Sequence, residues 1–493
     1  MPNSPTLRRP LVLASVMAAM FMIAIEATIV STAMPQIAGQ LGDLHLYAWV
    51  FSSFLLTQTA TTVVFGKLAD LYGRKPVLLV GIVIFLAGSV LCGFAWSMPS
   101  LIGFRLLQGV GAGAIQPVSL TVVGDLYSVQ ERGRIQGWIA SVWGISSVLG
   151  PLAGGLIIRH LSWAWIFWIN VPVGLVAFAG FSAFLHEKVA RQQHRVDVLG
   201  AGLFTAAIAS LMVALTGLGA QGAQGGGRAV APALGLFVLS VALFVVQERR
   251  ARDPMLAFAL WARRPIATAN GASLLSGMAI IGLTAFLPMY VQGVLQRSAL
   301  VAGFTLTAMV AGWPVGSIVA ARNFARLGLR TTLLLGAALL PTGALAFVAL
   351  GPGGSPVLAG AGSVVVGLGM GFLSTSAIVI VQDSVGWAER GAATASNIFS
   401  RNLGSTLGAT VLGGVLNLGL ARQGHGAVGF DQVRQLLDHP GALAGEAAAR
   451  AALGQALHLT FWAVFATTLA TLALATLVPA VALTLRPREV AME

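Results

Sequence analysis

Long runs of apolar residues, separated by short polar turns, follow one another along most of the chain. We count fourteen such runs, and each can cross a bilayer because about 20 residues at about 1.5 Å rise per residue span the hydrocarbon core. The runs cover approximately residues 11–34, 47–65, 77–96, 99–123, 135–158, 163–185, 197–218, 230–247, 265–291, 299–321, 331–351, 356–381, 394–420 and 458–484. The pattern therefore predicts an all-α polytopic membrane protein with fourteen transmembrane helices.

Composition narrows the class of protein further. Of the 493 residues, 57% are hydrophobic and 9% are charged, whereas a soluble domain carries about 25% charged residues. The net charge of +13 does not indicate a nucleic-acid partner, because positively charged loops on the inner side of a membrane give the same total. The single cysteine, Cys92, excludes a disulfide within the chain, and no Cys/His spacing indicates a metal site. We expect no metal and no cofactor.

The turns and an internal repeat predict the orientation and the domains. Lys and Arg are concentrated in the turns that share a side with both termini, which predicts cytoplasmic termini. Glu131-Arg132-Gly133 opens the fifth run and Glu389-Arg390-Gly391 opens the thirteenth, so the repeated unit has six helices and two helices are inserted between the halves. The predicted domains are an N-terminal six-helix bundle at 1–190, two inserted helices at 191–255 and a C-terminal six-helix bundle at 256–493 with an external segment at 421–457.

A charged turn between the second and third runs has a distinctive pattern. Residues 66–75 read GKLADLYGRK and contain three cations, one carboxylate and two glycines. An ordinary positively charged loop explains the cations but not Asp70 or the glycine spacing. The stretch resembles the G-x-L-A-D-x-x-G-R-K signature of major facilitator superfamily transporters, which implies that superfamily's fold. The resemblance also implies that one group of residues forms a conformational gate: Gly66, Asp70, Gly73, Arg74, Lys75 and, at the end of the fourth run, Asp125.

Glu26 is the only charged residue in the first run. A carboxylate inside a span costs several kcal/mol unless it is protonated, paired or facing water, so a functional role is the default interpretation. The stretch from Glu26 to Pro35 resembles D-x-T-I-V-x-x-A-x-P of the fourteen-helix drug:proton antiporters (the EmrB/QacA group), with glutamate in place of aspartate. The resemblance implies that Glu26 carries the transported proton. The alternative is a structural acid that bonds to a neighbouring helix.

Arg105 is the expected partner of Glu26. It precedes Gln108-Gly109 in a stretch that resembles the antiporter motif with an intramembrane arginine. The helical rise places Glu26 about 13 Å and Arg105 about 9 Å below the outer ends of their spans. Since arginine does not lose its proton in practice, the glutamate alone would titrate. The alternative is an arginine that reaches the outer surface with its long side chain.

Small residues recur every four positions in the fifth run. Ser146, Gly150 and Gly154 allow close packing of helices in lipid, and Pro151 interrupts the backbone hydrogen bonds. Small residues at this spacing are common in membrane helices. The stretch resembles the antiporter motif G-x-x-x-G-P-x-x-G, which assigns Gly150, Pro151 and Gly154 to the antiporter helix.

Taken together, these resemblances imply a proton-coupled antiporter that exports hydrophobic or amphipathic compounds, which is multidrug efflux, by alternating access. An exporter of a lipid, a siderophore or a specific metabolite on the same scaffold is the alternative. An enzyme is disfavoured because the sequence has no nucleophile constellation or nucleotide-binding loop, and a channel because it has no rings of repeated polar residues. We expect the proton gradient, and no cofactor, to supply the energy for transport.

The expected partners are the lipid bilayer, protons and small amphipathic substrates, in a prokaryotic inner membrane. We expect a monomer, and the question of a periplasmic adaptor protein as a partner stays open. The C-terminal half has no acid in most of its spans, and its polar candidates include Arg401. Candidates for a substrate cavity come from both halves: Phe21, Thr28, Gln58, Gln108, Trp143, Phe286, Trp313, Asn397 and Asn402.

Overall fold

The structure is a computed structural model that describes residues 5–41, 46–187, 197–219, 226–251, 258–297, 299–351, 354–423 and 446–479. Within these ranges all regular structure is helical, and no strand is present. The helices are α1 (Pro5–Leu41), α2 (Tyr47–Tyr72), α3 (Arg74–Gly93), α4 (Met98–Leu126), α5 (Val129–His160), α6 (Trp165–Trp168), α7 (Asn170–Phe184), α8 (Val198–Gly219), α9 (Gly226–Arg250), α10 (Phe258–Ala262), α11 (Arg264–Gly293), α12 (Ala299–Val348), α13 (Pro356–Asp383), η2 (Trp387–Glu389), α14 (Arg390–Gln423) and α16 (Glu446–Thr476).

Each of the fourteen predicted runs falls on a helix, as far as the described residues extend. By length and composition, 11 helices of the described chain can cross a membrane. One of these, α12, contains two predicted runs, which meet at Gly328 with φ 75° and ψ 163°. Gly73 turns the chain between α2 and α3 in the same way, with φ 95°. Only glycine adopts such a conformation without strain, so both turns depend on it. That all fourteen runs cross the bilayer stays a prediction.

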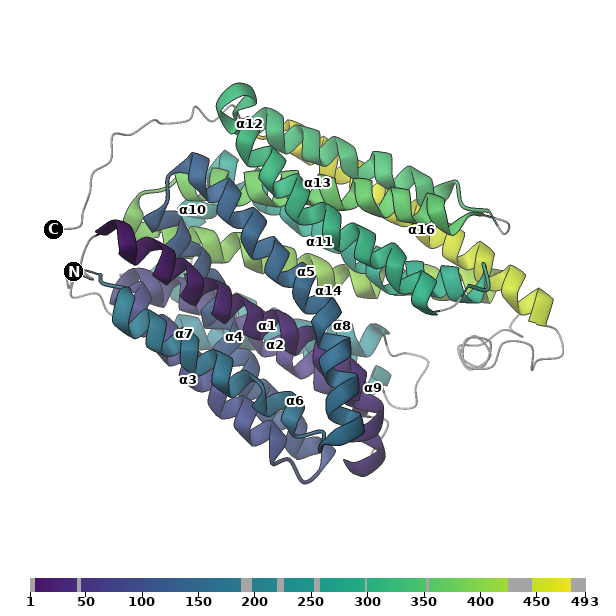
Figure 1. The fold of residues 1–493 in the computed structure, drawn as a ribbon, viewed down its shortest axis with the longest axis horizontal. Coiled ribbons are helices and arrows are strands. Elements are labelled where there is room, and N and C mark those ends of the chain that lie inside the picture. The colour runs from purple at the N-terminus through teal and green to yellow at the C-terminus, as the bar shows by residue number, and fades with distance from the viewer. Residues whose placement is uncertain are drawn as a thin grey trace.

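The long helices form two groups, purple to blue and green to yellow in Figure 1. The N-terminal group, α1 to α7, shares two clusters of buried apolar residues. The C-terminal group, α11 to α16, shares one larger cluster. The two groups meet where α5 packs on α12 and where α2 packs on α14. The division of the chain into three domains at the predicted boundaries stays a prediction.

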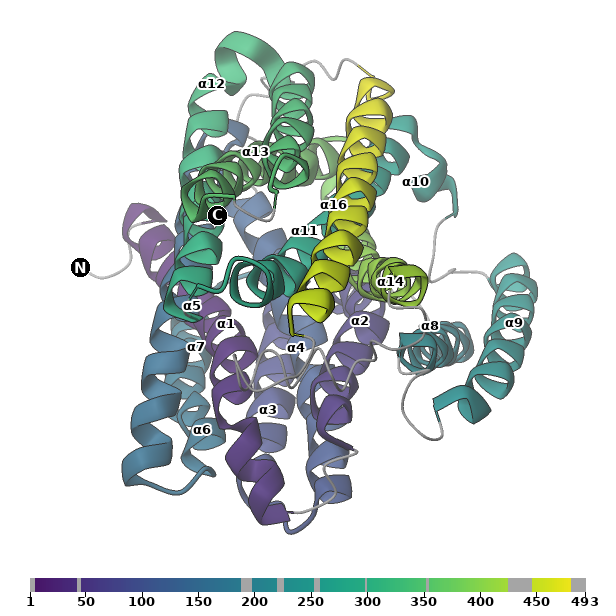
Figure 2. The same ribbon diagram turned by 90° about the vertical axis from the view of Figure 1, so that its right-hand side faces the viewer.

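The helices α8 and α9 form a hairpin beside the two groups, with α9 outermost (Figure 2). α8 packs on α2 of one group and on α14 of the other. Phe204 contacts Phe244 and Phe399, at ring-centroid distances of 5.6 Å and 5.7 Å. The Thr410 hydroxyl donates a hydrogen bond of 3.3 Å to the Leu215 carbonyl. The hairpin therefore covers the seam between α2 and α14.

Much of the predicted external segment at 421–457 lies outside the described residues, which resume at 446 with α16. The connection between α8 and α9, residues 220–225, lies outside them as well.

Candidate functional site

Glu26 and Arg105 form a salt bridge inside the N-terminal group. Arg105 donates from Nη1 to Oε1 of Glu26, and the two side chains are 2% and 0% exposed. The same Nη1 donates to Oε1 of Gln108 at 2.8 Å, and Nε donates to the Val50 carbonyl at 3.2 Å. The guanidinium also lies 4.4 Å above the Phe54 ring. Arg105, on α4, is thus held by contacts with α1 and α2 as well as with its own helix.

The second carboxylate oxygen of Glu26 is held by α7. Asn170 donates from Nδ2 to Oε2 of Glu26 and to the Ser89 hydroxyl at 3.0 Å. Ser89 in turn accepts from Nε2 of Gln108 at 3.2 Å and donates to the Phe167 carbonyl at 2.8 Å. We call Glu26, Ser89, Arg105, Gln108 and Asn170 the acid site. Both oxygens of a carboxylate without solvent exposure therefore have donors, as a buried charge requires.

Glycines on α3 and α4 bring the helices of the acid site close together. A Cβ on Gly88 would lie 2.6 Å from the Gln108 backbone nitrogen, and one on Gly109 would lie 2.1 Å from the Thr57 hydroxyl. Thr57 uses that hydroxyl to donate to the Leu106 carbonyl at 2.8 Å. Small residues thus place α4 directly against α2 and α3, and this contact fixes the position of Arg105.

The predicted antiporter helix, α5, packs on α1 next to the acid site. A Cβ on Gly150 would lie 2.1 Å from the Thr28 hydroxyl, which donates to the Ser146 carbonyl at 3.0 Å. Gly154 is buried, and Pro151 lies in the same helix. The small residues of α5 therefore contact α1 two residues from Glu26.

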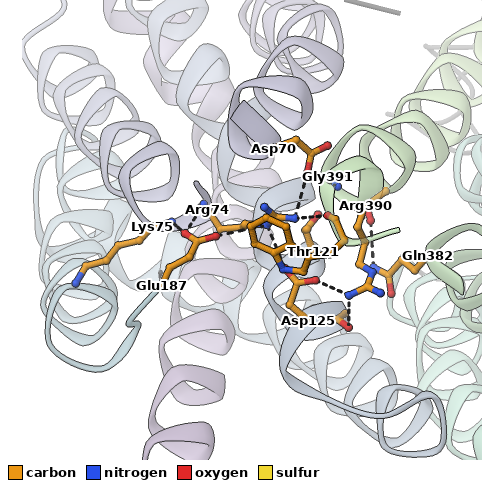
Figure 3. A network of polar contacts seen from close by, with 12 residues as sticks. Asp70, Arg74, Lys75, Thr121, Asp125, Glu187, Gln382, Arg390 and Gly391 are labelled. Atoms are coloured by element: carbon orange, nitrogen blue, oxygen red, sulfur yellow. Dashed lines mark hydrogen bonds and ion pairs between the residues drawn. The ribbon is translucent and has the colours of Figure 1, made fainter. Parts of the chain in front are cut away.

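A second polar cluster lies where α2, α3 and α4 end or begin, and Figure 3 shows it from close by. Arg74 is 1% exposed and pairs with Asp70 at 3.2 Å and with Asp125 at 3.1 Å. Oε2 of Glu187, just after α7, accepts from the backbone nitrogens of Arg74 at 2.7 Å and Lys75 at 3.2 Å. These contacts are all within the N-terminal group.

The same cluster ties the two groups together. Oδ1 and Oδ2 of Asp70 accept from the backbone nitrogens of Gly391 at 2.9 Å and Ala392 at 2.7 Å, in the first turn of α14. Nη1 of Arg390 pairs with Oδ1 of Asp125 at 2.6 Å (Figure 3). We call Asp70, Arg74, Asp125, Glu187 and Arg390 the latch cluster.

Trp387 and Gly66 complete the contact between the groups at the latch cluster. Arg74 donates from Nη2 to the Trp387 carbonyl at 2.7 Å, and its guanidinium lies 3.8 Å from the centroid of the Trp387 ring. A Cβ on Gly66 would lie 2.3 Å from the Cβ of Ala395, so α2 and α14 touch there. Lys75 points away from the cluster and donates from Nζ to the Ser182 carbonyl at 2.7 Å (Figure 3).

Burial changes how the carboxyl groups of the latch cluster titrate. It raises the pKa of Asp70 to about 7, although Arg74 and the amides of Ala392 and Gly391 act in the opposite direction. It also raises the pKa of Glu187, against the amide of Lys75 and the charge of Arg74. Both carboxyls therefore bind a proton more tightly in this joined arrangement than they would in water.

Several residues of both sites were not singled out from the sequence. Arg390 carried one signal, because it stands in the repeat of Glu131-Arg132-Gly133. Its counterpart Arg132 donates to the same Gly124 carbonyl from within the N-terminal group. Glu187 is an acid beside a basic turn, and Asn170 is an amide in an apolar run. Neither pattern is distinctive enough to identify a site.

The candidates for the substrate cavity are distributed over several environments. Gln108 belongs to the acid site, Phe286 is 8% exposed in the C-terminal core, and Gln58 is 6% exposed. Asn397 donates to Asn270 and Ser273, and Trp313 donates to Ser374 at 3.1 Å. Partly exposed side chains belong to Phe21, Thr28, Trp143 and Asn402. A common cavity for this set stays a prediction.

Comparison with known proteins places these sites in a family context. Residues 16–409 match the family model described as Major Facilitator Superfamily. The Multidrug transporter protein MdtP of Bacillus subtilis (strain 168) is 34% identical over 421 residues, 85% of this chain and 76% of that protein. Multidrug resistance protein 3 of the same strain is 35% identical over 397 residues, 80% of this chain and 77% of that protein.

A solved structure is similar in fold. The crystal structure of the human organic anion transporter MFSD10 (TETRAN) superposes with a TM-score of 0.63, covering 94% of this chain and 100% of that one. The sequence identity is 16%, so this likeness concerns the fold alone.

Proposed function

Because the chain belongs to the Major Facilitator Superfamily, we propose that this membrane transporter is a proton-coupled antiporter that exports hydrophobic or amphipathic compounds by alternating access. The acid site is the observation that carries the proposal. An ionisable residue in a membrane span marks proton or substrate pathways, and Glu26 is the acid of such a site. The names of the relatives, a multidrug transporter and a multidrug resistance protein, support efflux of several compounds.

Protonation of Glu26 would act on the packing of three helices. In the ion pair, Arg105 neutralises the carboxylate and Asn170 donates to its second oxygen. A proton on Glu26 removes the negative charge and leaves Arg105 without its counter-ion, and one unpaired charge in a dry interior costs several kcal/mol. The arrangement of α1, α4 and α7 must then change, and this change would couple the proton to the conformation.

The latch cluster would close one side of the transport pathway. Its contacts between the two groups of helices exist only when the groups are joined at that end, so these contacts bias the equilibrium between two conformations. We assign this end to the cytoplasm, which the positively charged turns favour, together with both termini. On this assignment all fourteen runs cross a prokaryotic inner membrane, and the chain is a fourteen-helix drug:proton antiporter.

Efflux from proteoliposomes under an imposed pH gradient tests the proposal. We expect Glu26→Gln to abolish proton-driven transport, because the amide keeps the shape and cannot titrate, while Glu26→Asp keeps substantial transport. The matched control is Glu131→Gln at an exposed helix start, where glutamine also completes the capping box with Ser128. Transport by the Glu26→Gln variant at the wild-type rate would refute proton coupling through this residue.

The alternative, a dedicated exporter of a lipid, siderophore or metabolite, predicts a different substrate profile in the same vesicles. A single transported class among chemically diverse compounds would favour it over multidrug efflux.

A further inference from the structure

Arg401 on α14 is a second arginine inside the membrane domain, and its environment differs from that of Arg105. It follows Arg390 by eleven positions, so it lies about 16 Å along α14 from the latch cluster at about 1.5 Å per residue. The predicted run begins at 394, so Arg401 lies about 10 Å inside the predicted span.

The side chain of Arg401 points towards the seam between the two groups of helices. Asn397, four positions earlier, bonds to Asn270 and Ser273 on α11. Ile398, three positions earlier, is 1% exposed and packs in an apolar cluster of the N-terminal group. Residues three and four apart lie on the same face of a helix, so Arg401 lies between the side that contacts α11 and the side that contacts the other group.

The backbone at Arg401 is fixed by close packing. A Cβ on Gly277 of α11 would lie 2.3 Å from the Arg401 carbonyl oxygen, which accepts a hydrogen bond from the Ser405 hydroxyl at 3.2 Å. The helix therefore cannot rotate freely to remove the guanidinium from the interior.

The guanidinium itself has no partner in the described part of the chain. It forms no ion pair and donates no hydrogen bond to any described residue. The side chain is partly exposed, so solvent or a ligand can reach it. Arg105 shows the contrast, because a carboxylate, an amide oxygen and a backbone carbonyl accept from it.

Even a partly buried cation is costly in a membrane span when it has no counter-ion, and such residues mark the path of a substrate or an ion. A planar guanidinium matches the oxygens of a carboxylate, sulfonate or phosphate. We propose that Arg401 binds the anionic group of a transported compound, so that amphipathic acids are among the substrates. This inference rests on the proposed transport function and names a substrate class for it.

Two fluorescent probes with the same ring system test the charge requirement. They are 8-anilinonaphthalene-1-sulfonate and N-phenyl-1-naphthylamine, which lacks the sulfonate, and binding is measured in phosphatidylcholine nanodiscs with empty nanodiscs subtracted. We expect Arg401→Gln to weaken sulfonate binding about 10-fold to 150-fold, the range for a hydrogen bond to a charged group, and to leave the neutral probe within about twofold. Arg401→Lys should keep part of the sulfonate affinity. The control is Arg159→Gln at an exposed position on α5.

Melting temperatures measured in parallel separate binding from folding. Arg401→Gln should melt at or above the wild-type temperature without ligand, because it removes an unpaired charge, and should lose the stabilisation by the sulfonate probe. Phosphatidylglycerol in the nanodiscs distinguishes two sources of the anion. Competition with the sulfonate in the wild type but not in Arg401→Gln identifies lipid headgroups as ligands, whereas no competition identifies free amphipathic acids; both results support an anion site.

Equal loss of both probes, unchanged sulfonate binding in Arg401→Gln, or no sulfonate binding by the wild type would overturn the inference. The binding measurement needs no proton gradient. A failure of proton-coupled efflux in the Glu26 experiment therefore leaves this test intact, and a failure here leaves the coupling proposal intact.

Discussion

Replacing Arg390 with glutamine removes contacts that exist only while the two groups of helices are joined. Its guanidinium pairs with Asp125 at 2.6 Å and donates to the Gly124 carbonyl at 3.3 Å, and both acceptors belong to α4 of the N-terminal group. A ligand or a contact shifts a conformational equilibrium only by the part of its free energy that differs between the two states. Nearly all of the free energy of this contact therefore opposes the separation of the two groups at the latch cluster.

The size of the effect follows from the exposure of the pair. The side chains of Arg390 and Asp125 are 17% and 15% exposed, so the pair is neither fully buried nor a surface pair. A hydrogen bond to a charged group contributes about 1.5–3 kcal/mol. Arg74 still neutralises Asp125 in the variant, so no unpaired carboxylate adds to the cost. We expect the ratio of closed to open molecules to fall about 10-fold to 150-fold.

Distances between spin labels at Tyr72 and Arg326 measure that ratio. Both positions are exposed, and they belong to different groups of helices. The one native cysteine, Cys92, is fully buried, so cysteines introduced at the two positions can be labelled selectively. In the Arg390→Gln variant a population with a longer distance should grow.

Arg263→Gln is the matched control for this prediction. Arg263 pairs with Glu389 at 3.1 Å, but both residues belong to the C-terminal group and their side chains are 42% and 44% exposed. Such a surface pair contributes about 0–1 kcal/mol and does not join the two groups. The reasoning fails if Arg390→Gln leaves the distance distribution unchanged, or if Arg263→Gln shifts it equally.

Three further substitutions test other contacts. Burial raises the pKa of Asp70 to about 7 in the joined arrangement, against about 3.9 in water. The closed state is therefore favoured as the pH falls from 7 towards 4, and it opens more easily as the pH rises through 7. Asp70→Asn should remove this pH dependence from the spin-label distance. Gly66→Ala should separate α2 from α14 and enlarge the open population, because its Cβ would lie 2.3 Å from that of Ala395. The control is Gly103→Ala, whose Cβ would meet no atom within 4 Å and which should raise the free energy of unfolding by about 0.5–1 kcal/mol. Asn170→Leu should reduce proton-coupled efflux about 10-fold or more in proteoliposomes, since it removes a donor to the Glu26 carboxylate, and an unchanged rate would show that Asn170 does not position the acid.

The positions of the helices could be predicted because the bilayer imposes them. A span must satisfy its backbone groups internally and must be apolar over its length, so the runs mark the helices without homology. Depth along a helix is equally predictable from the rise per residue, and the similar depths of Glu26 and Arg105 predict that they form a pair. Glycine spacing likewise indicated the turn at Gly73.

The rotation of each helix and the contacts between the halves could not be predicted in the same way. A helix that is apolar all round carries no amphipathic pattern to say which side faces the pathway. The substrate-cavity candidates are therefore chosen by residue type alone, and the hydrogen-bond networks that contain Gln108 and Asn397 could not be foreseen. The pair of Asp125 and Arg390 joins residues far apart in the sequence, and only the internal repeat drew attention to Arg390.

The hairpin of α8 and α9 rests on the seam between α2 and α14 through contacts of a particular kind. The dispersion attraction between apolar side chains such as Phe204 and Phe399 depends only weakly on direction, so these side chains can shift against each other at a smaller cost in free energy than hydrogen-bonded groups can. The hydrogen bond between Arg390 and Asp125 depends on distance and angle, so it weakens steeply when the two groups separate. If the two groups move against each other, the apolar contacts of the covered seam can persist through the movement. The polar contacts of the latch cluster between the groups are then either formed or broken.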